Sequence, residues 1–588
     1  MEHRYENGKI IVSGKFYEEA VYHVSNDCMS AVFNGKGTVT GYALANDKSI
    51  MKGNISYFHS GEAVEVYLNK TVEMAGRCQI TDIDLQDGRL TVKQFVDSSV
   101  NGVFASYAFK SDKKDDAIEV AYGGMPPTKE FEAAENEISY DGVIFGADTA
   151  IEYAKETRAA YFTVKAGETV HTFLSCGEKA VPSAAYIKDF AEYEKKMQAE
   201  FDRVIIPDGL SEEQKALFIN AYFCAYENYK VLGDYKAFMA GHIYLLPMRS
   251  YYRDSYYTVL PMYRQHSDLV RNQIITLARG ISENGDCPSA VRWDYSGHWG
   301  NHYDSPSFPA MMLWDYVKYT NDTAILSEKI NNTTVLGRIT DAVEKLAGFA
   351  DETGLIYKEG RYNMRDWADE VCRSGYVTYD EVLFARALYS LSKLYELTGD
   401  GKLAAEYMTR FEKVKQAVNH ILWDDELGWY VNFKDGDFTE KNLSVDTCFA
   451  ALFGIAEGDR AVRMLKNMEN ILESKNNPDQ KAGDFGVMCV YPFYSRKDGA
   501  RHKSSQPYYY HNGANWPYLS AMYAAAKRKF GMEYRYALES WFDYNVERGN
   551  YTPVEFFSPP QPDGSLLQAW SGAAAFVIDE EISVGFWD

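Results

Sequence analysis

Short runs of β-branched and apolar residues, separated by turn signals, mark the first part of the chain. Segments 9–12, 63–68 and 89–92 are examples, and Gly, Asn and Asp lie between such runs. Helical spacing of apolar residues is hard to find before residue 186. The pattern predicts a large antiparallel β-sandwich with polar outer faces over residues 1–185.

The spacing becomes helical after a stretch rich in Glu, Lys and Ala, which predicts a helical linker over residues 186–209. Helix-start signals then appear, such as Ser211 and Ser444 ahead of periodic segments. The predicted helices are 211–230, 252–265, 267–284, 306–321, 325–350, 379–399, 401–422, 444–456, 458–474, 513–530, 532–549 and 566–577.

So many helices in one region predict helix pairs that close into an (α/α)6 barrel, or toroid, over residues 210–588. An open helical solenoid is the competing arrangement, and the lack of a short repeat period weakens it. The expected fold class is therefore multidomain β + α, with an N-terminal antiparallel β-sandwich followed by an (α/α)6 barrel.

Long loops between the predicted helices hold much of the Trp, Tyr, His, Asp and Gly of this region. They cover 284–306, 351–378, 424–443, 475–512 and 550–566. Long loops in a compact domain tend to be functional, so we expect these loops to gather at one mouth of the toroid.

The formal net charge of −23 argues against a nucleic acid or an anionic membrane surface as partner. A neutral oligosaccharide is compatible with it. Aromatic residues make up 15% of the chain. Most of them are expected in the core, and the remainder suit a sugar cleft, because pyranose C–H faces stack on aromatic rings.

The eight cysteines are scattered without a Cys-x-x-Cys pair, as in a cytoplasmic protein with reduced thiols. The chain contains no run of about 18 apolar residues, so no membrane span is predicted. The first residues lack the apolar core of a secretory signal, so we expect a cytoplasmic location. A signal peptide removed from a longer precursor stays an open alternative, and the oligomeric state is left open. No cofactor is expected.

Two constellations carry charged groups in a suggestive order. Arg253 and Asp254 lie at a predicted helix start, where they can bind vicinal hydroxyls; alternatively, Asp254 caps the helix and Arg253 pairs on the surface. Asp366, Asp369 and Glu370 surround a Trp, and repulsion and desolvation would raise their pKa values as a general acid requires. A solvated acidic loop is the alternative.

Two further segments suit a sugar site. Glu555 lies in a Pro- and Phe-rich loop and suits a general base, although an ordinary surface Glu fits equally. The segment 293–304 begins with Trp293, ends with Asp304, and looks like a cleft wall with an aromatic platform. Its histidines, His298 and His302, are four residues apart, but Gly297 and Gly300 make a helix there unfavourable, and no other spacing supports zinc. No metal is therefore expected.

In chain order, several blocks resemble the inverting α-glucoside hydrolases with an α/α toroid. That family includes amylo-α-1,6-glucosidases of the glycogen-debranching type, glucoamylases and processing α-glucosidases. The blocks are Arg253-Asp254-Ser255 with Leu260-Pro261, Tyr303-Asp304, Trp367-Ala368-Asp369, Tyr510-His511-Asn512-Gly513 with Trp516-Pro517, Glu555, and Gln568-Ala569-Trp570-Ser571. An N-terminal sandwich before the toroid also fits such enzymes.

The resemblance implies roles for individual residues. Asp369 falls on the family's general acid and Glu555 on its general base. With the cleft wall included, the substrate-binding residues are expected to be Arg253, Asp254, Trp293, Asp304, Trp367, His511, Trp516, Gln568 and Trp570.

The chain also departs from the family. Tyr252 stands where a Gly usually precedes the Arg-Asp pair, and the acids beside Asp369 leave Asp366 or Glu370 as alternative general acids. The expected function is inverting hydrolysis that removes a terminal sugar, with α-linked glucose favoured, from an oligosaccharide or glycoside. An enzyme like the α-L-rhamnosidases, a disaccharide phosphorylase and a non-catalytic carbohydrate-binding protein are the alternatives.

Overall fold

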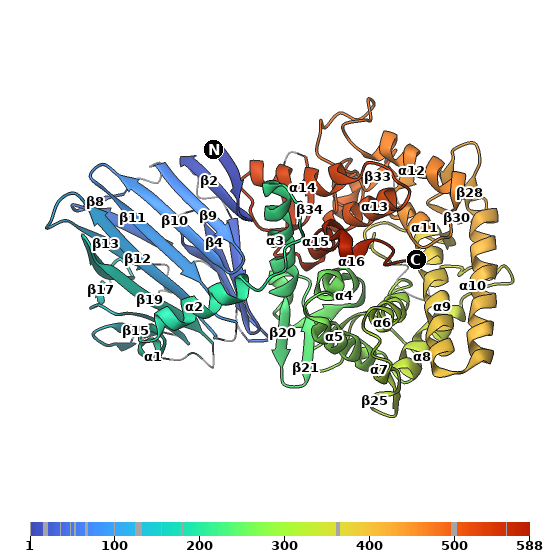
Figure 1. Cartoon of the computed structure of the whole chain (residues 1–588), viewed down its shortest axis with the longest axis horizontal. Helices are drawn as coiled ribbons and strands as arrows, with labels where there is room; N and C mark the ends of the chain where they lie inside the picture. Colours follow the sequence, from blue (N-terminus) through green and yellow to red (C-terminus); the bar gives the residue numbers. More distant parts are fainter. Residues whose placement is uncertain are drawn as a thin grey trace. The chain divides into compact units, whose positions relative to one another are not determined.

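The computed structural model describes residues 2–15, 21–35, 37–47, 49–51, 54–64, 69–98, 100–123, 132–140, 142–154, 156–177, 180, 182–359, 365–494, 502–559 and 561–588 (Figure 1). The chain forms two compact units, each described here by itself. The β unit comprises Met1–Leu232, Gly241–Met248 and Asn545–Pro553, and the helical unit comprises Gly233–Ala240, Arg249–Tyr544 and Val554–Asp588. The predicted boundaries at residues 185 and 209 stay a prediction.

The β unit is built on three antiparallel sheets. The ten-stranded sheet runs β1 (Glu2–Glu6), β2 (Lys9–Lys15), β9 (Asn69–Ala75), β10 (Cys78–Leu85), β11 (Gly88–Phe95), β12 (Val103–Ser111), β19 (Thr169–Cys176), β16 (Val143–Ala147), β15 (Glu137–Tyr140), β14 (Glu132–Ala133). The five-stranded sheet runs β17 (Glu152–Ala154), β18 (Ala159–Lys165), β13 (Ala117–Gly123), β7 (Asn54–His59), β8 (Glu62–Ala63). The four-stranded sheet runs β3 (Val21–Ser25), β4 (Met29–Asn34), β5 (Val39–Leu44), β6 (Ser49–Met51).

Strand alternation gives the ten-stranded sheet two buried faces. On one face Tyr107 of β12 meets Phe162 of the five-stranded sheet, with ring centroids 5.2 Å apart. On the other face Phe104, three residues earlier in β12, contacts Phe190 of α2 (Phe190–Phe201) at 5.8 Å. Because successive side chains of a strand point to opposite faces, one strand supplies both layers. The predicted antiparallel β-sandwich is confirmed.

The predicted strands at 9–12 and 89–92 lie within β2 and β11. Of the predicted strand at 63–68, Ala63 is the last residue of β8, and residues 65–68 lie outside the described residues. The helices of this unit are α1 (Ser183–Ile187), α2 and α3 (Glu212–Tyr226), with the short η1 (His242–Tyr244) and strand β20 (Tyr229–Leu232). Ser211 caps α3 by accepting the Gln214 N–H at 3.1 Å, as its sequence predicts.

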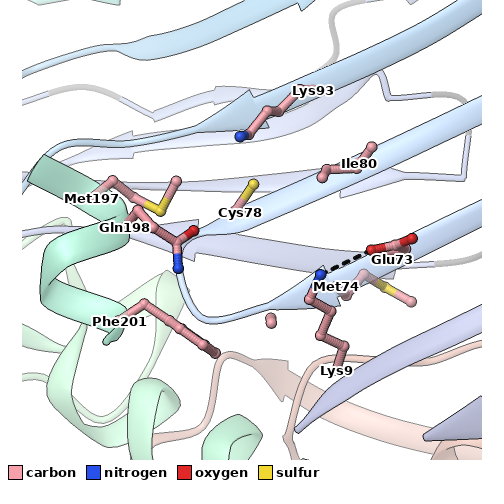
Figure 2. Close-up of a pocket in the computed structure, with 10 residues that line it drawn as sticks. Lys9, Glu73, Met74, Cys78, Ile80, Lys93, Met197, Gln198 and Phe201 are labelled. Atoms are coloured by element: carbon pink, nitrogen blue, oxygen red, sulfur yellow. Dashed lines mark hydrogen bonds and ion pairs between the residues drawn. The ribbon is translucent and has the colours of Figure 1, made fainter. Parts of the chain in front are cut away.

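A cavity of about 110 Å³ lies between α2 and the ten-stranded sheet (Figure 2). Cys78, Met74 and Met197 are among its apolar lining residues, and Lys9 at its edge pairs with Glu73 at 3.1 Å. Its one carboxylate is thus held by a lysine, so this cavity has no free acid for chemistry.

The helical unit contains α4 (Tyr252–Val259), α5 (Ser267–Gly280), α6 (Ser307–Thr320), α7 (Ala324–Ser327), α8 (Val335–Ala347), α9 (Thr378–Thr398), α10 (Gly401–Ile421), α11 (Cys448–Leu452), α12 (Gly458–Leu472), α13 (Pro517–Lys529), most of α14 (Arg535–Glu547), α15 (Gly572–Ile578) and α16 (Glu580–Ser583). Short 3₁₀ turns are η2 (Leu260–Met262), η3 (Val445–Thr447), η4 (His502–Ser505) and η5 (Ala569–Ser571). None of the helices in the described ranges has the length and apolar character of a membrane span.

Short strands connect these helices. They are β21 (Tyr235–Phe238), β22 (Arg249–Tyr251), β23 (Pro288–Arg292), β24 (Gly297–Asn301), β25 (Lys329–Ile330), β26 (Thr333–Thr334), β27 (Tyr376–Val377), β28 (Trp423–Asp424), β29 (Trp429–Tyr430), β30 (Phe433–Asp435), β31 (Phe438–Glu440), β32 (Leu443–Ser444), β33 (Val490–Tyr491), β34 (Val554–Ser558) and β35 (Gln561–Leu566). Most of them lie in the long loops, where backbone pairing orders the described residues of these strands.

The predicted single helix over 325–350 is wrong. The chain forms α7, then a hairpin of β25 and β26, and then α8. The helix α7 ends at Ser327, because Glu328 is extended with φ −60° and ψ 131°. Asn331 at the hairpin turn has φ 47°, a left-handed conformation that Asn tolerates well. Thr334 then caps α8 by accepting the Gly337 N–H at 3.0 Å.

Candidate active site

The first turn of α4 presents Arg253 and Asp254, both buried. Arg253 Nη1 lies 3.0 Å from Asp304 Oδ2, and Gln568 Nε2 donates to Asp254 Oδ1 at 3.4 Å. Tyr251, not Asp254, occupies the cap position of α4. The reading of this pair as a helix cap and a surface ion pair is therefore wrong. The structure brings four predicted site residues together here.

Burial raises the pKa of Asp254 to about 7, against the lowering effect of Arg253, and the charge of Glu555 raises it further. Burial also raises the pKa of Asp304, and its Oδ1 has no hydrogen-bond partner among the described residues. A buried acceptor without a partner is unusual in a folded protein, and it marks a place for an ordered water or a ligand hydroxyl.

Asp366 is held by cations on both sides. Arg373 Nε donates to Asp366 Oδ2 at 3.0 Å, and Lys358 Nζ donates to the same carboxylate while also donating to Asp380 Oδ2 at 2.9 Å. Burial alone raises the pKa of Asp366, but Arg373 and Lys358 outweigh it and hold that pKa well below its usual range. Asp366 therefore stays ionised and fully bonded, which disfavours it as a general acid.

The same network fixes the loop that carries Trp367. Arg373 Nη1 donates to Asp446 Oδ2 at 2.7 Å, and Trp367 Nε1 donates to the same oxygen at 2.5 Å. The Ala368 N–H closes the loop onto Asp366 Oδ1 at 2.8 Å. The residue that follows, Asp369, is thus projected from a rigid turn.

Arg373→Met should lower the free energy of unfolding by about 3–5 kcal/mol, because it leaves Asp366 and Asp446 buried without their shared cation. Arg373 is 0% exposed. Urea denaturation, followed by tryptophan fluorescence, measures the change. The matched control is Arg410→Met, which removes a partly exposed partner of Glu344 and should cost less than about 1 kcal/mol. Equal losses in the two variants would contradict the structural role of this network.

Asp369 differs from Asp366 in its surroundings. Its side chain is 14% exposed, and its Oδ1 lies 3.9 Å from His511 Nε2. Burial raises the pKa of Asp369 to about 7; Arg253 and Arg365 oppose the shift, and Glu370 and Glu555 add to it. A carboxyl of this kind holds its proton near neutral pH.

His511 is buried beside Asp369 and neutral, because burial lowers its pKa well below the usual value. The backbone N–H of Glu370 donates to its Nδ1 at 3.4 Å. A neutral imidazole that accepts at Nδ1 carries its proton on Nε2. His511 therefore directs an N–H donor toward the region of Asp369, and this Nε2 has no hydrogen-bond partner among the described residues.

Glu555 lies on β34, which joins the other loops through the backbone. Asn515 and Phe557 exchange hydrogen bonds of 3.0 Å in both directions. The Glu555 carboxylate accepts from Tyr510 Oη at 3.4 Å and from the Ser565 N–H at 3.1 Å. The interpretation of Glu555 as an ordinary surface residue is not supported, because the residue is partly buried and its carboxylate accepts two hydrogen bonds.

Stacked rings connect His511 with Phe556, the residue after Glu555. Trp516 stacks on His511 at 4.9 Å and on Phe556 at 5.4 Å, and Trp570 lies 5.7 Å from Trp516. The Trp516 Nε1 donates to the Tyr510 carbonyl at 3.1 Å. These contacts bring Trp516 and Trp570, predicted from separate blocks, into one wall.

Trp293 is a predicted site residue that does not join this cluster. Among the described residues, no ring contact or polar contact links it to the others. It is 41% exposed at the turn between β23 and β24. The same hairpin instead brings Trp299 to Tyr251, just before α4, at 6.2 Å. The predicted cleft wall at 293–304 contains both Trp293 and Trp299, and the sequence alone does not distinguish them.

Sequence reasoning missed Lys358, Arg365, Arg373 and Asp446, because none of them belongs to a predicted motif block. Tyr510 belongs to such a block, but the sequence predicts no contact with Glu555 for it. Among the described residues, no group of three or more His, Cys, Asp or Glu is placed to hold a metal ion.

Comparison with protein families places part of this site in a known domain. Residues 349–571 match the family model described as "Mannosylglycerate hydrolase MGH1-like glycoside hydrolase domain". The match covers less than half of the chain, and it includes Asp369, His511 and Glu555 but not Arg253 or Asp304.

Two curated relatives from Paenibacillus borealis are similar over short segments. Solabiose phosphorylase is 28% identical over 195 residues, which is 30% of this chain and 25% of that protein. A 3-O-β-D-glucopyranosyl-β-D-glucuronide phosphorylase is 25% identical over 191 residues, which is 29% of this chain and 24% of that protein. The matches thus span about a quarter of each relative's length.

Solved structures match the fold over nearly the whole chain. A bacterial glucoamylase solved with acarbose matches with a TM-score of 0.64 and 11% identity, over 98% of both chains. A rhamnosidase from Klebsiella oxytoca with rhamnose bound matches with a TM-score of 0.51 and 16% identity, over 96% of both chains. The expected fold, a β-sandwich followed by an (α/α)6 toroid, is confirmed, and so is the resemblance to the (α/α)6 glycoside hydrolase superfamily.

Proposed function

We propose that this protein is an inverting glycoside hydrolase that removes a terminal sugar, with α-linked glucose favoured, from an oligosaccharide or glycoside. One observation carries the proposal: the carboxyl groups of Asp369 and Glu555 come from loops far apart in the sequence but belong to one cluster. Asp369 has a pKa near 7, and the charge of Glu555 contributes to that raised pKa. The Arg253–Asp254 pair lies in the same cluster.

In the proposed reaction Asp369 gives its proton to the glycosidic oxygen as the bond to the anomeric carbon breaks. Glu555 takes a proton from a water molecule that attacks the opposite face of that carbon. The products are the free sugar with inverted anomeric configuration and the released alcohol, and Asp369 and Glu555 return to their starting states through solvent. Tyr510 and the Ser565 N–H orient the Glu555 carboxylate for this step.

In this proposal the terminal sugar binds against Arg253, Asp254 and Asp304. Three buried polar atoms there have no hydrogen-bond partner among the described residues, namely Asp304 Oδ1, His511 Nε2 and Trp570 Nε1. Hydroxyl groups can both donate and accept, so a bound pyranose satisfies an acceptor and two donors at once. The Trp516 ring supports that wall.

The activity should fall as pH rises through about 7, because the general acid works only while Asp369 is protonated. The profile to measure is that of kcat/KM, which reports groups of the free enzyme. Asp254 also has a pKa near 7, so the test compares profiles of the wild type and Asp369→Asn. If the residual activity of Asp369→Asn keeps the same falling limb, the limb belongs to another group.

Proton NMR of the fresh product tests the proposal. A panel of α-linked glucose disaccharides is extended with α-mannosides and α-L-rhamnosides, in buffers with and without phosphate. β-Glucose as the first product supports inverting hydrolysis and identifies the linkage. First release of α-glucose means retention, which contradicts the roles given to Asp369 and Glu555.

Phosphorolysis is the second candidate, favoured by the names of the two curated relatives. In that reaction phosphate replaces the attacking water, and a general base is not needed. A sugar 1-phosphate as product, formed only with phosphate present, would decide for phosphorolysis. Release of free sugar at the same rate without phosphate would decide for hydrolysis.

A further inference from the structure

One short turn, residues 508–513, reaches both carboxyls of the proposed mechanism. Tyr510 in this turn donates through Oη to Glu555 at 3.4 Å. The next residue, His511, places Nε2 3.9 Å from Asp369 Oδ1. Adjacent residues do not move independently, because a planar peptide unit joins them. A shift of this turn therefore changes the surroundings of the proposed acid and of the proposed base together.

The backbone of the turn is strained. Tyr508 and Tyr510 have φ 62° and 50°, in the left-handed region that bulky residues avoid, and Gly513 has φ 109°. Strain of this kind persists only where surrounding contacts hold it, and it collects at functional sites. Part of the hold is internal, since the Tyr508 N–H donates to the Asn512 carbonyl at 2.8 Å. The end of the turn at Gly513 is held by contacts from outside it.

Gly513 is suited to its position because it has no side chain. A Cβ atom there would lie 2.7 Å from Cε1 of Phe493, which is closer than real Cβ contacts come. The Phe493 ring packs edge-on against Tyr508, with ring centroids 4.8 Å apart, so moving that ring disturbs the start of the turn. Both the positive φ and the lack of space therefore favour glycine at this position.

Cys489 holds the same end of the turn. Its thiol donates to the Tyr510 carbonyl at 3.5 Å, and its sulfur accepts the Gly513 N–H at 3.3 Å. Its backbone N–H donates to the Ala514 carbonyl at 2.9 Å. Cys489 is 1% exposed, and burial raises the pKa of the thiol to about 12, so the S–H donor is present at neutral pH. One buried sulfur thus bonds to the turn at two points that are three residues apart.

We propose that Gly513 and Cys489 are positioning residues of the proposed active site. They hold the turn 508–513 in the conformation that presents one side chain to the proposed base and the next side chain to the proposed acid. This inference rests on the proposed function. A role of this kind predicts that a loosened turn lowers kcat much more than it raises KM, because the groups that act in the reaction are displaced.

Gly513→Ala tests the turn on two substrates with the same terminal sugar: the disaccharide found by NMR and the glycosyl fluoride, which needs the base but no proton from the acid. On the disaccharide, kcat should fall by about 10- to 100-fold with KM within about 3-fold, since small displacements of catalytic groups have effects of this size. On the fluoride, kcat should fall by about 3-fold or more, because Glu555 also loses its oriented partner.

The matched control is Gly399→Ala. Gly399 also has a left-handed φ, 82°, but an added Cβ meets no atom within 4 Å. This variant carries similar backbone strain far from the turn in sequence, and it should leave kcat within about 2-fold. Wild-type kcat on both substrates in a folded Gly513→Ala would overturn the proposal. If Gly513→Ala does not fold, the cysteine variants decide it.

Cys489→Ala removes both sulfur bonds and should lower kcat on the disaccharide by about 10-fold. Cys489→Ser should keep most of the activity, because a hydroxyl still donates and accepts. The falling limb of kcat/KM, which the proposed mechanism assigns to Asp369, should move to higher pH in Cys489→Ala, since the carboxylate loses the N–H that His511 directs toward it. Cys224→Ala, in the similarly buried α3, is the control for lost packing and should keep the wild-type kcat and limb.

Hydrogen exchange followed by mass spectrometry gives a readout that needs no turnover. The peptide that contains residues 508–513 should exchange faster in Cys489→Ala, because the Gly513 N–H loses its acceptor, while peptides of α9 stay unchanged. Unchanged exchange in that peptide, or equal kcat losses in Cys489→Ser and Cys489→Ala, would overturn the positioning role. A wild type that cleaves neither substrate contradicts the proposed function instead, and the exchange result then decides whether Cys489 holds the turn.

Discussion

Glu555→Gln should lower kcat by at least roughly 100-fold while the protein stays folded, because general base catalysis contributes about 10²–10⁴-fold. The amide keeps the shape of the side chain and its contacts with Tyr510 and Ser565, but it cannot take a proton from water. Steady-state kinetics on the substrate found by NMR measures the loss. Circular dichroism and the thermal midpoint check the fold.

Two comparisons sharpen this test. Glu396→Gln changes an exposed glutamate of α9 and should leave kcat within about 2-fold. Azide added to Glu555→Ala should restore turnover of the glycosyl fluoride, since this anion needs no base to attack the anomeric carbon. The product would be the β-glycosyl azide, with fluoride leaving. Near-normal kcat in Glu555→Gln would remove Glu555 from the mechanism.

Asp369→Asn should show the second large effect, a loss of about 10²–10⁴-fold in kcat/KM on the disaccharide. The loss should shrink to a few-fold on the glycosyl fluoride, because fluoride leaves without a full proton transfer. The reason is that Asp369 acts on the leaving oxygen alone. Kinetics on the two substrates, run side by side, measure this difference.

The neighbouring acid provides the matched control. Glu370→Gln should retain activity on both substrates within a few-fold, since it keeps the backbone N–H that bonds to His511 and removes only one of the charges that raise the pKa of Asp369. A larger loss in Glu370→Gln than in Asp369→Asn would exchange the roles of these two residues. An equal loss on disaccharide and fluoride in Asp369→Asn would point to a binding role for Asp369 instead.

The local pattern of apolar residues was sufficient to predict most of the fold. Helices such as α9 (Thr378–Thr398) and α10 (Gly401–Ile421) follow from apolar spacing, and Gly399 between them, at φ 82°, is the left-handed residue that ends α9. The sequence does not predict the hairpin that interrupts the helix expected at 325–350, because each of its two strands has only two residues. Pairing, rather than residue preference, decides a hairpin of that size.

The choice among three nearby acids needed the tertiary structure. Residue type and closeness to Trp367 do not separate Asp366, Asp369 and Glu370, and only the family resemblance favours Asp369. In space, Asp366 is held by Lys358 and Arg373, while Asp369 is mostly buried beside a neutral histidine. The charges that separate their pKa values thus come largely from contacts that local sequence does not reveal.

The choice between two tryptophans was also tertiary. Trp293 and Trp299 lie in one hairpin, and only the pairing of β23 with β24 and the contact with Tyr251 bring Trp299 toward α4. By itself, the sequence determined the two architectures, the order of the motif blocks and the identity of the candidate acids, because hydrophobic period and residue type are local properties. The tertiary structure alone showed the surroundings that separate the pKa values of Asp366 and Asp369, and the contact that brings Trp299 to Tyr251. Both depend on burial and on side-chain contacts that the linear order of residues does not reveal.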